Sequence, residues 1–535
     1  MYLRGNLICT DRRRTTTTTD TNDDGRHTLN PSMSEADARV EFWSSHCFSY
    51  LFISQPSDRC IRRRPTIPSS ILVAVAVAVA VAVGFASYYF SSVTMAATLI
   101  RAVLPATVLS LLPPHFSYGF YFRHAAVTPK KRSQSSALTS TVAASADRVT
   151  SFWEWRGHDI FTEVRIAQKT EGDYINTPSV ILLHGLGAST TYWRETMSVL
   201  QKEGYDVHAL DLLGQGRSSK PIYLGENSSS VPFKYDVDAT PPGMEMGKSS
   251  NKNVEYSINL WANIVDDYAR YRHLDDVVLM GNSLGSLVAL SATTGEFIVS
   301  TKDEEERSAY LIGKSADGRS RVKGLCLFNC AVGMNSRNAI KNPRFNPLQR
   351  AVFNRIFDVV NCLVFDNKIV LRFILNVVVT KEWVEDVLKR LYMYSPDRVD
   401  KELVDSFYYP AKMGGEGAVE SIRQIHTNNA GLTPMEYHQK YPVILDSLPL
   451  HLIWGLEDAI TPIHGQVGLF YCDRVANNRG RNGRTTIDVV KSGHIPFDDN
   501  PLDTHNALLR WLEKIKTLCD KTEVGQDTGV ALSLL

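Results

Sequence analysis

The sequence predicts an α/β fold: a mostly parallel central sheet with helices on both faces and an inserted helical cap. Two observations lead to this prediction. From about residue 151, short apolar segments alternate with helical stretches, and one long helical stretch interrupts the alternation. Short strands that are apolar on both faces are typical of a parallel sheet covered by helices. With 44% of its 535 residues hydrophobic, the chain can bury such a sheet.

Each expected strand runs into a turn. The segment 159–167 is expected to be an edge strand. The expected buried strands span residues 179–183, 206–210, 276–280, 324–328, 448–454 and 486–490. Since parallel strands place their carboxyl ends at the same edge of a sheet, ligands are expected to bind there.

The stretch from 331 to 441 is too long for a single crossover. Helical patterns over Pro347–Phe365 and Trp383–Tyr394 predict that it forms a helical cap over the carboxyl ends of the strands. Pro347 suits a first helical position, where its missing N–H leaves no bond unmade. Within the cap, residues 359–379 are strongly apolar, so they form either a core-facing helix surface or the lining of a channel for a long isoprenoid chain.

The first 150 residues differ in composition from the rest. Two apolar segments, 71–86 and 99–112, precede a basic segment, 123–148, that is rich in Ser, Thr and Ala and has no acidic residue until Asp147. An apolar signal before a basic, hydroxyl-rich segment is typical of import into a plastid. We therefore expect a chloroplast or other plastid location, with membrane association as an option. The alternatives are a simple membrane anchor and a gene-model error upstream of Met95.

These patterns divide the chain into parts with different expected roles. The parts are a targeting region, 1–150; a first core part, 151–330; the cap, 331–441; a second core part, 442–520; and a flexible tail, 521–535. The net charge of +1 gives no reason to expect a nucleic-acid partner. Eight scattered cysteines without zinc-like spacing predict reduced thiols and no structural metal.

The segment Gly281–Gly285 reads G-x-S-x-G and carries the strongest chemical signal. It directly follows a predicted strand and directly precedes a helix of small residues. That setting is typical of a nucleophile elbow, a tight turn that lifts a serine hydroxyl above the sheet. The alternative is an ordinary glycine turn before a helix. We predict that Ser283 is a nucleophile.

A serine hydroxyl is a weak nucleophile and needs a base. His494 follows the last predicted strand, and Asp458 follows the strand before it. Ser, then Asp, then His is the chain order of a triad on such a sheet, so we predict His494 as the base and Asp458 as the acid that fixes its tautomer. Glu457 is a weaker substitute for Asp458. Asp498 and Asp499 are expected to be solvated or capping groups.

An ester-cleaving serine also needs donors for the oxyanion of its intermediate. The backbone N–H of Leu284, directly after the nucleophile, is the first expected donor. The second should come from the glycine-containing loop after the strand 179–183, where we prefer Leu186 and place Gly187 second. His184 is expected to brace this loop. A dinucleotide-type glycine turn is disfavoured because the loop lacks G-x-G-x-x-G.

Taken together, these residues resemble the α/β-hydrolase superfamily over about residues 151–516, and within it the plastid pheophytinase and chlorophyll dephytylase group. The motifs concerned are Phe152–His158, His184–Ser189 with Trp193, Asp211–Ser218, Gly281–Gly285, and Asn329–Ala331 with Gly333–Asn335. Two features depart from the group: Ser286 stands where a second glycine is usual, and the cap matches only loosely. The resemblance implies the α/β-hydrolase fold and a serine carboxylic-ester hydrolase that removes phytol from chlorophyll-type pigments through an acyl-enzyme, without a cofactor.

Other readings of the same residues stay open. One is hydrolysis of, or acyl transfer from, another plastid lipid ester, and another is a ligand-binding protein of low turnover. Dehalogenases and epoxide hydrolases of this fold are disfavoured because they place Asp where this chain has Ser283. The expected partner is a hydrophobic pigment or lipid ester, with peripheral association with the thylakoid membrane as a further expectation.

Overall fold

The computed structural model describes residues 148–167, 177–222, 245–248, 254–298, 321–477 and 484–524. The predicted targeting region lies outside the described residues, apart from its last few positions. Among the described residues, no helix combines the length and the apolar character needed to cross a membrane.

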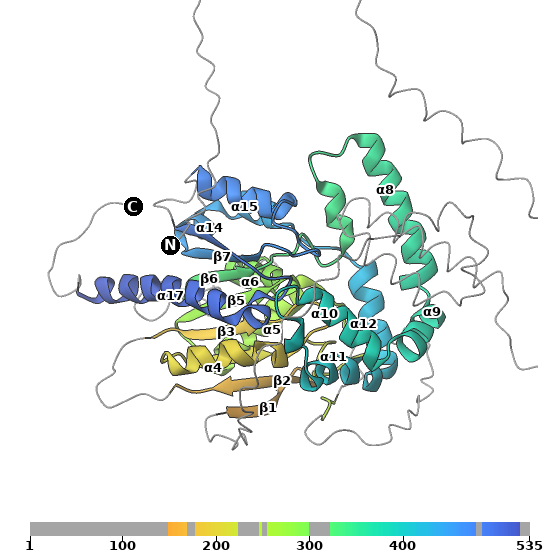
Figure 1. Ribbon diagram of the computed structural model, residues 1–535, viewed down its shortest axis with the longest axis horizontal. Helices are drawn as coiled ribbons and strands as arrows, with labels where there is room; N and C mark the ends of the chain where they lie inside the picture. Colours follow the sequence, from red (N-terminus) through yellow and green to blue (C-terminus); the bar gives the residue numbers. More distant parts are fainter. Residues whose placement is uncertain are drawn as a thin grey trace, which may run out of the picture. The chain divides into compact units, whose positions relative to one another are not determined.

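An eight-stranded sheet forms the centre of the described chain (Figure 1), with strand order β1-β2-β4-β3-β5-β6-β7-β8. The strands are β1 Arg148–Trp155, β2 His158–Arg165, β3 Ser179–Leu183, β4 Val207–Leu210, β5 Val277–Asn282, β6 Val322–Phe328, β7 Leu450–Gly455 and β8 Thr485–Val490. The pairs β1–β2 and β2–β4 are antiparallel, and the pairs from β4 onward are parallel. The mostly parallel sheet of the α/β-hydrolase fold is therefore confirmed.

The edge of the sheet differs from the prediction. The segment expected at the edge forms β2, which lies between β1 and β4. β1 holds the edge, and Arg156 and Gly157 join it to β2 in a two-residue hairpin with positive φ at both positions. The first half of β1 is exposed, so no apolar run marks it as a strand in the sequence.

Helices cover both faces of the sheet. The core helices are α4 Arg194–Lys202, α5 Ile258–Tyr271, α6 Leu284–Thr294, α15 Gln466–Ala476, α16 Pro496–Asp499 and α17 Pro501–Val524. On β3, Val180 and Leu182 belong to the apolar cluster that includes side chains of α4 and α17. Ile181 and Leu183 belong to the cluster that includes α5 and α6. This alternation explains why the strand reads as a continuous apolar run.

The cap occupies the long stretch between β6 and β7, and Figure 1 shows α10, α11 and α12 grouped at one end of the strands. Its elements are η4 Ser336–Lys341, α8 Pro347–Val360, η5 Asn361–Phe365, α9 Lys368–Phe373, η6 Ile374–Val378, α10 Lys381–Leu391, η7 Pro396–Arg398, α11 Lys401–Met413, α12 Gly415–Thr427, α13 Pro434–Lys440 and α14 Pro442–Ser447. α8 begins with a capping box between Asn346 and Gln349, with Pro347 in the first turn, and continues into the π-helical turn η5.

The strongly apolar segment 359–379 has two faces. Five of its side chains are buried: Val364, Val370, Leu371, Leu375 and Val379. Four others are exposed: Val359, Ile369, Phe373 and Val377. The segment is therefore partly core, as one of the two alternatives held, and partly an apolar outer surface, which neither alternative anticipated.

Candidate active site

Ser283 lies in the turn between β5 and α6, as the motif predicts. Its backbone has φ 53° and ψ −115°. This conformation is strained for a residue other than glycine and is found mainly in special turns at functional sites. A Cβ atom on Gly281 would lie 2.3 Å from the carbonyl oxygen of Gly285, and one on Gly285 would lie 2.2 Å from that of Leu183. Both flanking positions therefore require glycine.

Hydrogen bonds hold the turn in place. The backbone N–H of Ser283 donates to the carbonyl oxygen of Phe328 at 2.9 Å. Ser286, at the position where the related group usually has glycine, is buried and donates its hydroxyl to the carbonyl oxygen of Gly281 at 2.7 Å. This departure from the group thus adds a hydrogen bond within the elbow.

His494 and Asp458 meet next to this turn. The Nδ1 atom of His494 lies 2.9 Å from Oδ2 of Asp458. The elbow residue Asn282 donates its side-chain amide to the backbone carbonyl of His494 at 3.2 Å, so the histidine loop is bonded directly to the elbow. Because Nδ1 faces a carboxylate, Nε2 is the ring nitrogen that can accept a proton from a hydroxyl.

Asp458 is buried and surrounded by donors. Its Oδ1 accepts from the backbone N–H groups of Ile460 at 2.8 Å and Thr461 at 3.1 Å, and its Oδ2 accepts from the Thr461 hydroxyl at 2.6 Å. Burial opposes the charge, but the charge of His494 and hydrogen bonds from His494, Thr461 and Asn329 outweigh it and lower the pKa of Asp458 to about 2. The carboxylate is therefore charged at neutral pH.

The neighbouring carboxylate Glu457 differs from Asp458 in its exposure and in its contacts. Its side chain is exposed, whereas Asp458 is only 3% exposed and contacts the imidazole. The described structure thus favours Asp458 over the weaker substitute as the partner of His494.

Asn329 is a residue of this site that the sequence analysis used only as part of a resemblance. It follows β6, is fully buried and has φ 46°, a left-handed conformation that Asn tolerates better than most residues. Its amide nitrogen donates to Oδ2 of Asp458, and its amide oxygen accepts from the backbone N–H of Gly455 at 3.1 Å. One side chain thereby joins the ends of β6 and β7 and orients the acid.

The loop after β3 lies against the elbow. A Cβ atom on Gly185 would be 3.2 Å from Cβ of Ser283. The backbone N–H of Gly187, the second choice as oxyanion donor, is taken by Oε1 of Gln215 at 2.7 Å. Within the described ranges, no acceptor is recorded for the backbone N–H of Leu186 or of Leu284. These two groups are the candidate oxyanion donors.

Buried polar side chains brace that loop. Nε2 of His184 accepts from the backbone N–H of Leu212 at 2.9 Å, so its proton is on Nδ1, which donates to the carbonyl oxygen of Gly185 at 2.7 Å. Burial lowers the pKa of His184 and keeps the ring neutral. The hydroxyl of Tyr192 accepts from the N–H of Gly185 at 2.6 Å. The loop is therefore preorganised rather than free.

Asp498 and Asp499 were expected to be solvated or capping groups, and the solvated alternative is wrong because both side chains are fully buried. Asp498 accepts from the Tyr392 hydroxyl at 2.7 Å and forms ion pairs at 3.3 Å with Arg194 and Arg398. Asp499 accepts backbone N–H groups from both the cap and the histidine loop, those of Ser395 and Gly493, each at 2.7 Å. The pair fastens the cap to the loop that carries His494.

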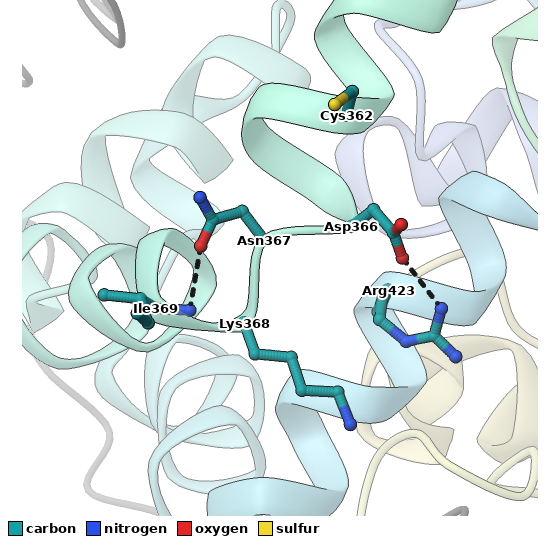
Figure 2. A pocket seen from close by; sticks show the side chains of 6 residues that line it. All are labelled: Cys362, Asp366, Asn367, Lys368, Ile369 and Arg423. Atoms are coloured by element: carbon teal, nitrogen blue, oxygen red, sulfur yellow. Dashed lines mark hydrogen bonds and ion pairs between the residues drawn. The ribbon is translucent and has the colours of Figure 1, made fainter. Parts of the chain in front are cut away.

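A hollow of about 450 Å³ opens elsewhere, in the cap (Figure 2). It is lined by Cys362, Asp366, Asn367, Lys368, Ile369 and Arg423. Arg423 pairs with Asp366 at 3.0 Å, and Lys368 pairs with Glu420 at 3.0 Å, so its cations are neutralised. The residues predicted for the triad and the oxyanion donors do not line it, and we assign it no part in the reaction.

Comparison with known proteins bears on this site. A family model described as "Alpha/beta hydrolase family" matches residues 180–507, more than half of the chain. "Pheophytinase, chloroplastic" of Arabidopsis thaliana is 30% identical over 130 residues, which are 23% of this chain and 25% of that protein. The chain thus matches about a quarter of the length of this curated relative.

Solved structures of similar chains include a thermophilic esterase from Thermogutta terrifontis and epoxide hydrolase I from potato, Solanum tuberosum. The esterase is 17% identical, with 69% of this chain and 100% of that chain covered and a TM-score of 0.40. The epoxide hydrolase is 14% identical, with 69% and 99% covered and a TM-score of 0.43. Similarity at this level says nothing about substrate.

Proposed function

Because this chain belongs to the α/β-hydrolase family, we propose that it is a serine carboxylic-ester hydrolase with Ser283, Asp458 and His494 as its triad. The observation that carries the proposal is the 2.9 Å contact between His494 Nδ1 and buried Asp458, in a loop bonded to the elbow of Ser283. A nucleophile, a base and an orienting acid at the carboxyl edge of the sheet are the groups that acyl transfer needs.

In the first half of the reaction, His494 Nε2 takes the proton of the Ser283 hydroxyl as its oxygen attacks the ester carbonyl carbon. The carbonyl oxygen becomes an oxyanion, which the N–H groups of Leu284 and Leu186 stabilise. The imidazolium then gives its proton to the alcohol oxygen as the carbon–oxygen bond breaks. The alcohol leaves and the acyl group stays on Ser283.

In the second half, His494 removes a proton from water as the water oxygen attacks the acyl carbon. The bond to Ser283 breaks, and the serine oxygen takes the proton back from His494. Throughout both halves, charged Asp458 stabilises the imidazolium form of His494 and keeps Nε2 directed at the reacting oxygen. The chain's own groups thus suffice for the cycle.

We further propose that the substrate is a hydrophobic ester, with the phytyl ester of chlorophyll-type pigments as the leading candidate. The partial similarity to a chloroplastic pheophytinase supports this choice, and it also supports a plastid location. A fluorescent fusion of residues 1–150 should accumulate in plastids. A cytosolic or plasma-membrane signal would contradict the proposed location.

The substrate test uses the full chain, incubated separately with chlorophyll a, pheophytin a and p-nitrophenyl butyrate. Chromatography should detect dephytylated pigment and phytol, and Ser283→Ala should abolish both pigment and butyrate turnover. Turnover retained by Ser283→Ala would refute the triad. Butyrate cleavage without phytol release would refute the pigment substrate and point to another plastid lipid ester.

A further inference from the structure

The outer side of the cap segment 347–378 exposes large apolar side chains. Six of the seventeen large apolar side chains that are exposed among the described residues lie here: Leu348, Val352, Val359, Ile369, Phe373 and Val377. Single exposed apolar residues are normal on a protein surface, but a contiguous group of them marks an interaction site.

The spacing of these residues places them on stripes. Leu348, Val352 and Val359 are separated by four and seven positions, so they lie on one side of α8, and Phe353 on another side of the helix is buried. A second stripe runs along α9 and η6, where Ile369 and Val377 are 70% and 58% exposed. An ordinary surface helix has a mainly polar outer side, whereas these helices also expose large apolar side chains there.

The α8 stripe is not required for packing of the core. α8 packs chiefly against η4 and η5, its neighbours in sequence. Figure 1 shows it on the outer side of the cap, away from the sheet. Its outer side chains are thus available to something outside the described chain.

The overlapping stretch from Arg337 to Arg372, which begins before α8, is basic. Between Arg337 and Arg372 the sequence has seven Lys and Arg residues against two Asp, a net charge of +5 compared with +1 for the whole chain. Several of these cations are paired; Lys368, which lines the hollow of Figure 2, contacts Glu420 at 3.0 Å. Arg344 and Arg355 near the α8 stripe are exposed and form no ion pair within the part of the chain that the structure describes, whereas Arg350 donates to the carbonyl oxygen of Asn342 at 3.3 Å.

We propose that this surface, which we call the cap docking face, binds a lipid bilayer that contains anionic lipids. Apolar helix sides enter the boundary between headgroups and acyl chains, while flanking arginines meet negative headgroups. A second copy of the chain could also cover an apolar face, but a symmetric dimer would bring the same arginines of both copies together and repel. The charge therefore favours the bilayer.

The first test is flotation of the full chain with vesicles of phosphatidylcholine alone or mixed with phosphatidylglycerol. Binding should be stronger to the anionic vesicles. The triple variant Leu348→Ser, Val352→Ser, Val359→Ser should lose affinity by about tenfold or more. The control Val443→Ser, Val489→Ser, Leu502→Ser removes three exposed apolar side chains outside the cap docking face and should bind like the wild type. Equal affinity of the two triple variants would overturn the proposal.

Hydrogen exchange shows whether the cap docking face contacts the bilayer when another part of the chain also binds vesicles. Anionic vesicles should slow exchange in residues 347–378, because docking suppresses local opening there, and leave residues 434–447 unchanged. Unchanged exchange in 347–378 on a vesicle-bound chain would overturn the proposal. So would a stripe variant that binds vesicles normally but dissociates a dimer in sedimentation, because the occupant would then be a second copy.

Failure of this inference is distinguishable from failure of the proposed reaction. The stripe variant should hydrolyse soluble p-nitrophenyl butyrate at the wild-type rate, since α8 packs chiefly against η4 and η5 and carries none of the proposed catalytic residues. Ser283→Ala should float with vesicles like the wild type. A stripe variant that lost butyrate hydrolysis along with vesicle binding would show a structural defect and overturn the assignment.

Discussion

The carboxyl edge of the sheet and the outer cap distribute polar and apolar side chains in opposite ways. At the sheet edge, polar side chains such as Asn329 and Asp458 are buried and hydrogen-bonded to several partners. In the outer cap, apolar side chains such as Leu348 and Ile369 are exposed. The first region holds polar side-chain atoms in fixed positions, and the second presents an apolar and basic surface. Under the two proposals made above, the core would carry the reaction and the cap would contact the bilayer.

The two regions are nevertheless mechanically linked. The backbone N–H of His494 donates to the carbonyl oxygen of Leu391 in α10 at 3.0 Å. Asp498 and Asp499 bind both cap and core groups within a few residues of the same histidine. The predictions below separate what the core does from what the cap does, from the largest expected effect to the smallest.

The largest effect should come from Asp458→Asn. The change keeps the size of the side chain but replaces the acceptor of His494 Nδ1–H with a group that can favour the wrong tautomer, so kcat on a soluble ester should fall about 10⁴-fold. Steady-state kinetics with p-nitrophenyl butyrate measures it, with a circular dichroism melt as the control for folding. A loss below tenfold in a folded variant would contradict the role of Asp458.

A smaller loss of activity should follow Asn329→Gly. Glycine adopts the φ of 46° without strain but removes the amide that donates to Asp458. Losing a buried hydrogen bond to a charged group is worth about 1.5–3 kcal/mol, so kcat should fall by about ten- to a hundredfold while KM stays constant. A change confined to KM would mean that Asn329 acts on substrate binding instead of orienting the acid.

Acid should destabilise the wild type more than Asp458→Asn. The folded pKa of Asp458 is depressed from 3.8 to about 2, so its stabilising contribution is present above the unfolded pKa and is lost as pH falls through the folded one. The free energy of unfolding should therefore drop by about 2 kcal/mol more in the wild type between about pH 4 and pH 2. Urea denaturation across this range measures it, and parallel pH profiles would contradict a charged, buried Asp458.

The smallest effect should come from Tyr392→Phe. Tyr392 directly follows α10, and the change removes the hydroxyl that donates a hydrogen bond to Asp498. One neutral-to-charged hydrogen bond is lost while Arg194 and Arg398 remain, so the free energy of unfolding should fall by about 1–2 kcal/mol. Soluble-ester kcat should stay within about twofold of the wild type. A large kcat loss at unchanged stability would show that the cap contact positions His494 directly.

Much of the core was predictable because its signals are local. Continuous apolar runs identified the parallel strands, and a glycine-flanked serine between a strand and a helix identified the elbow. β1 was missed because its first half is exposed, so packing against β2 rather than sequence pattern makes it a strand.

Features that depend on distant contacts could not be predicted in the same way. Two adjacent aspartates, 498 and 499, look solvated in sequence, but both are buried. Arg194, Arg398 and Tyr392 satisfy Asp498, and backbone N–H groups of the cap and of the histidine loop satisfy Asp499. Asn329 belongs to a motif of the resemblance, but the sequence does not give its role, which arises where the ends of β6 and β7 meet. The apolar segment 359–379 gave no sign of which side chains face outward.

The most direct test of the central claim is covalent labelling of the full chain with a fluorophosphonate, followed by peptide mass spectrometry. The account predicts a single fast-forming adduct on Ser283, slowed by several orders of magnitude in His494→Ala because the hydroxyl then lacks its base. An adduct on another serine, or equal labelling of Ser283 with and without His494, would contradict it.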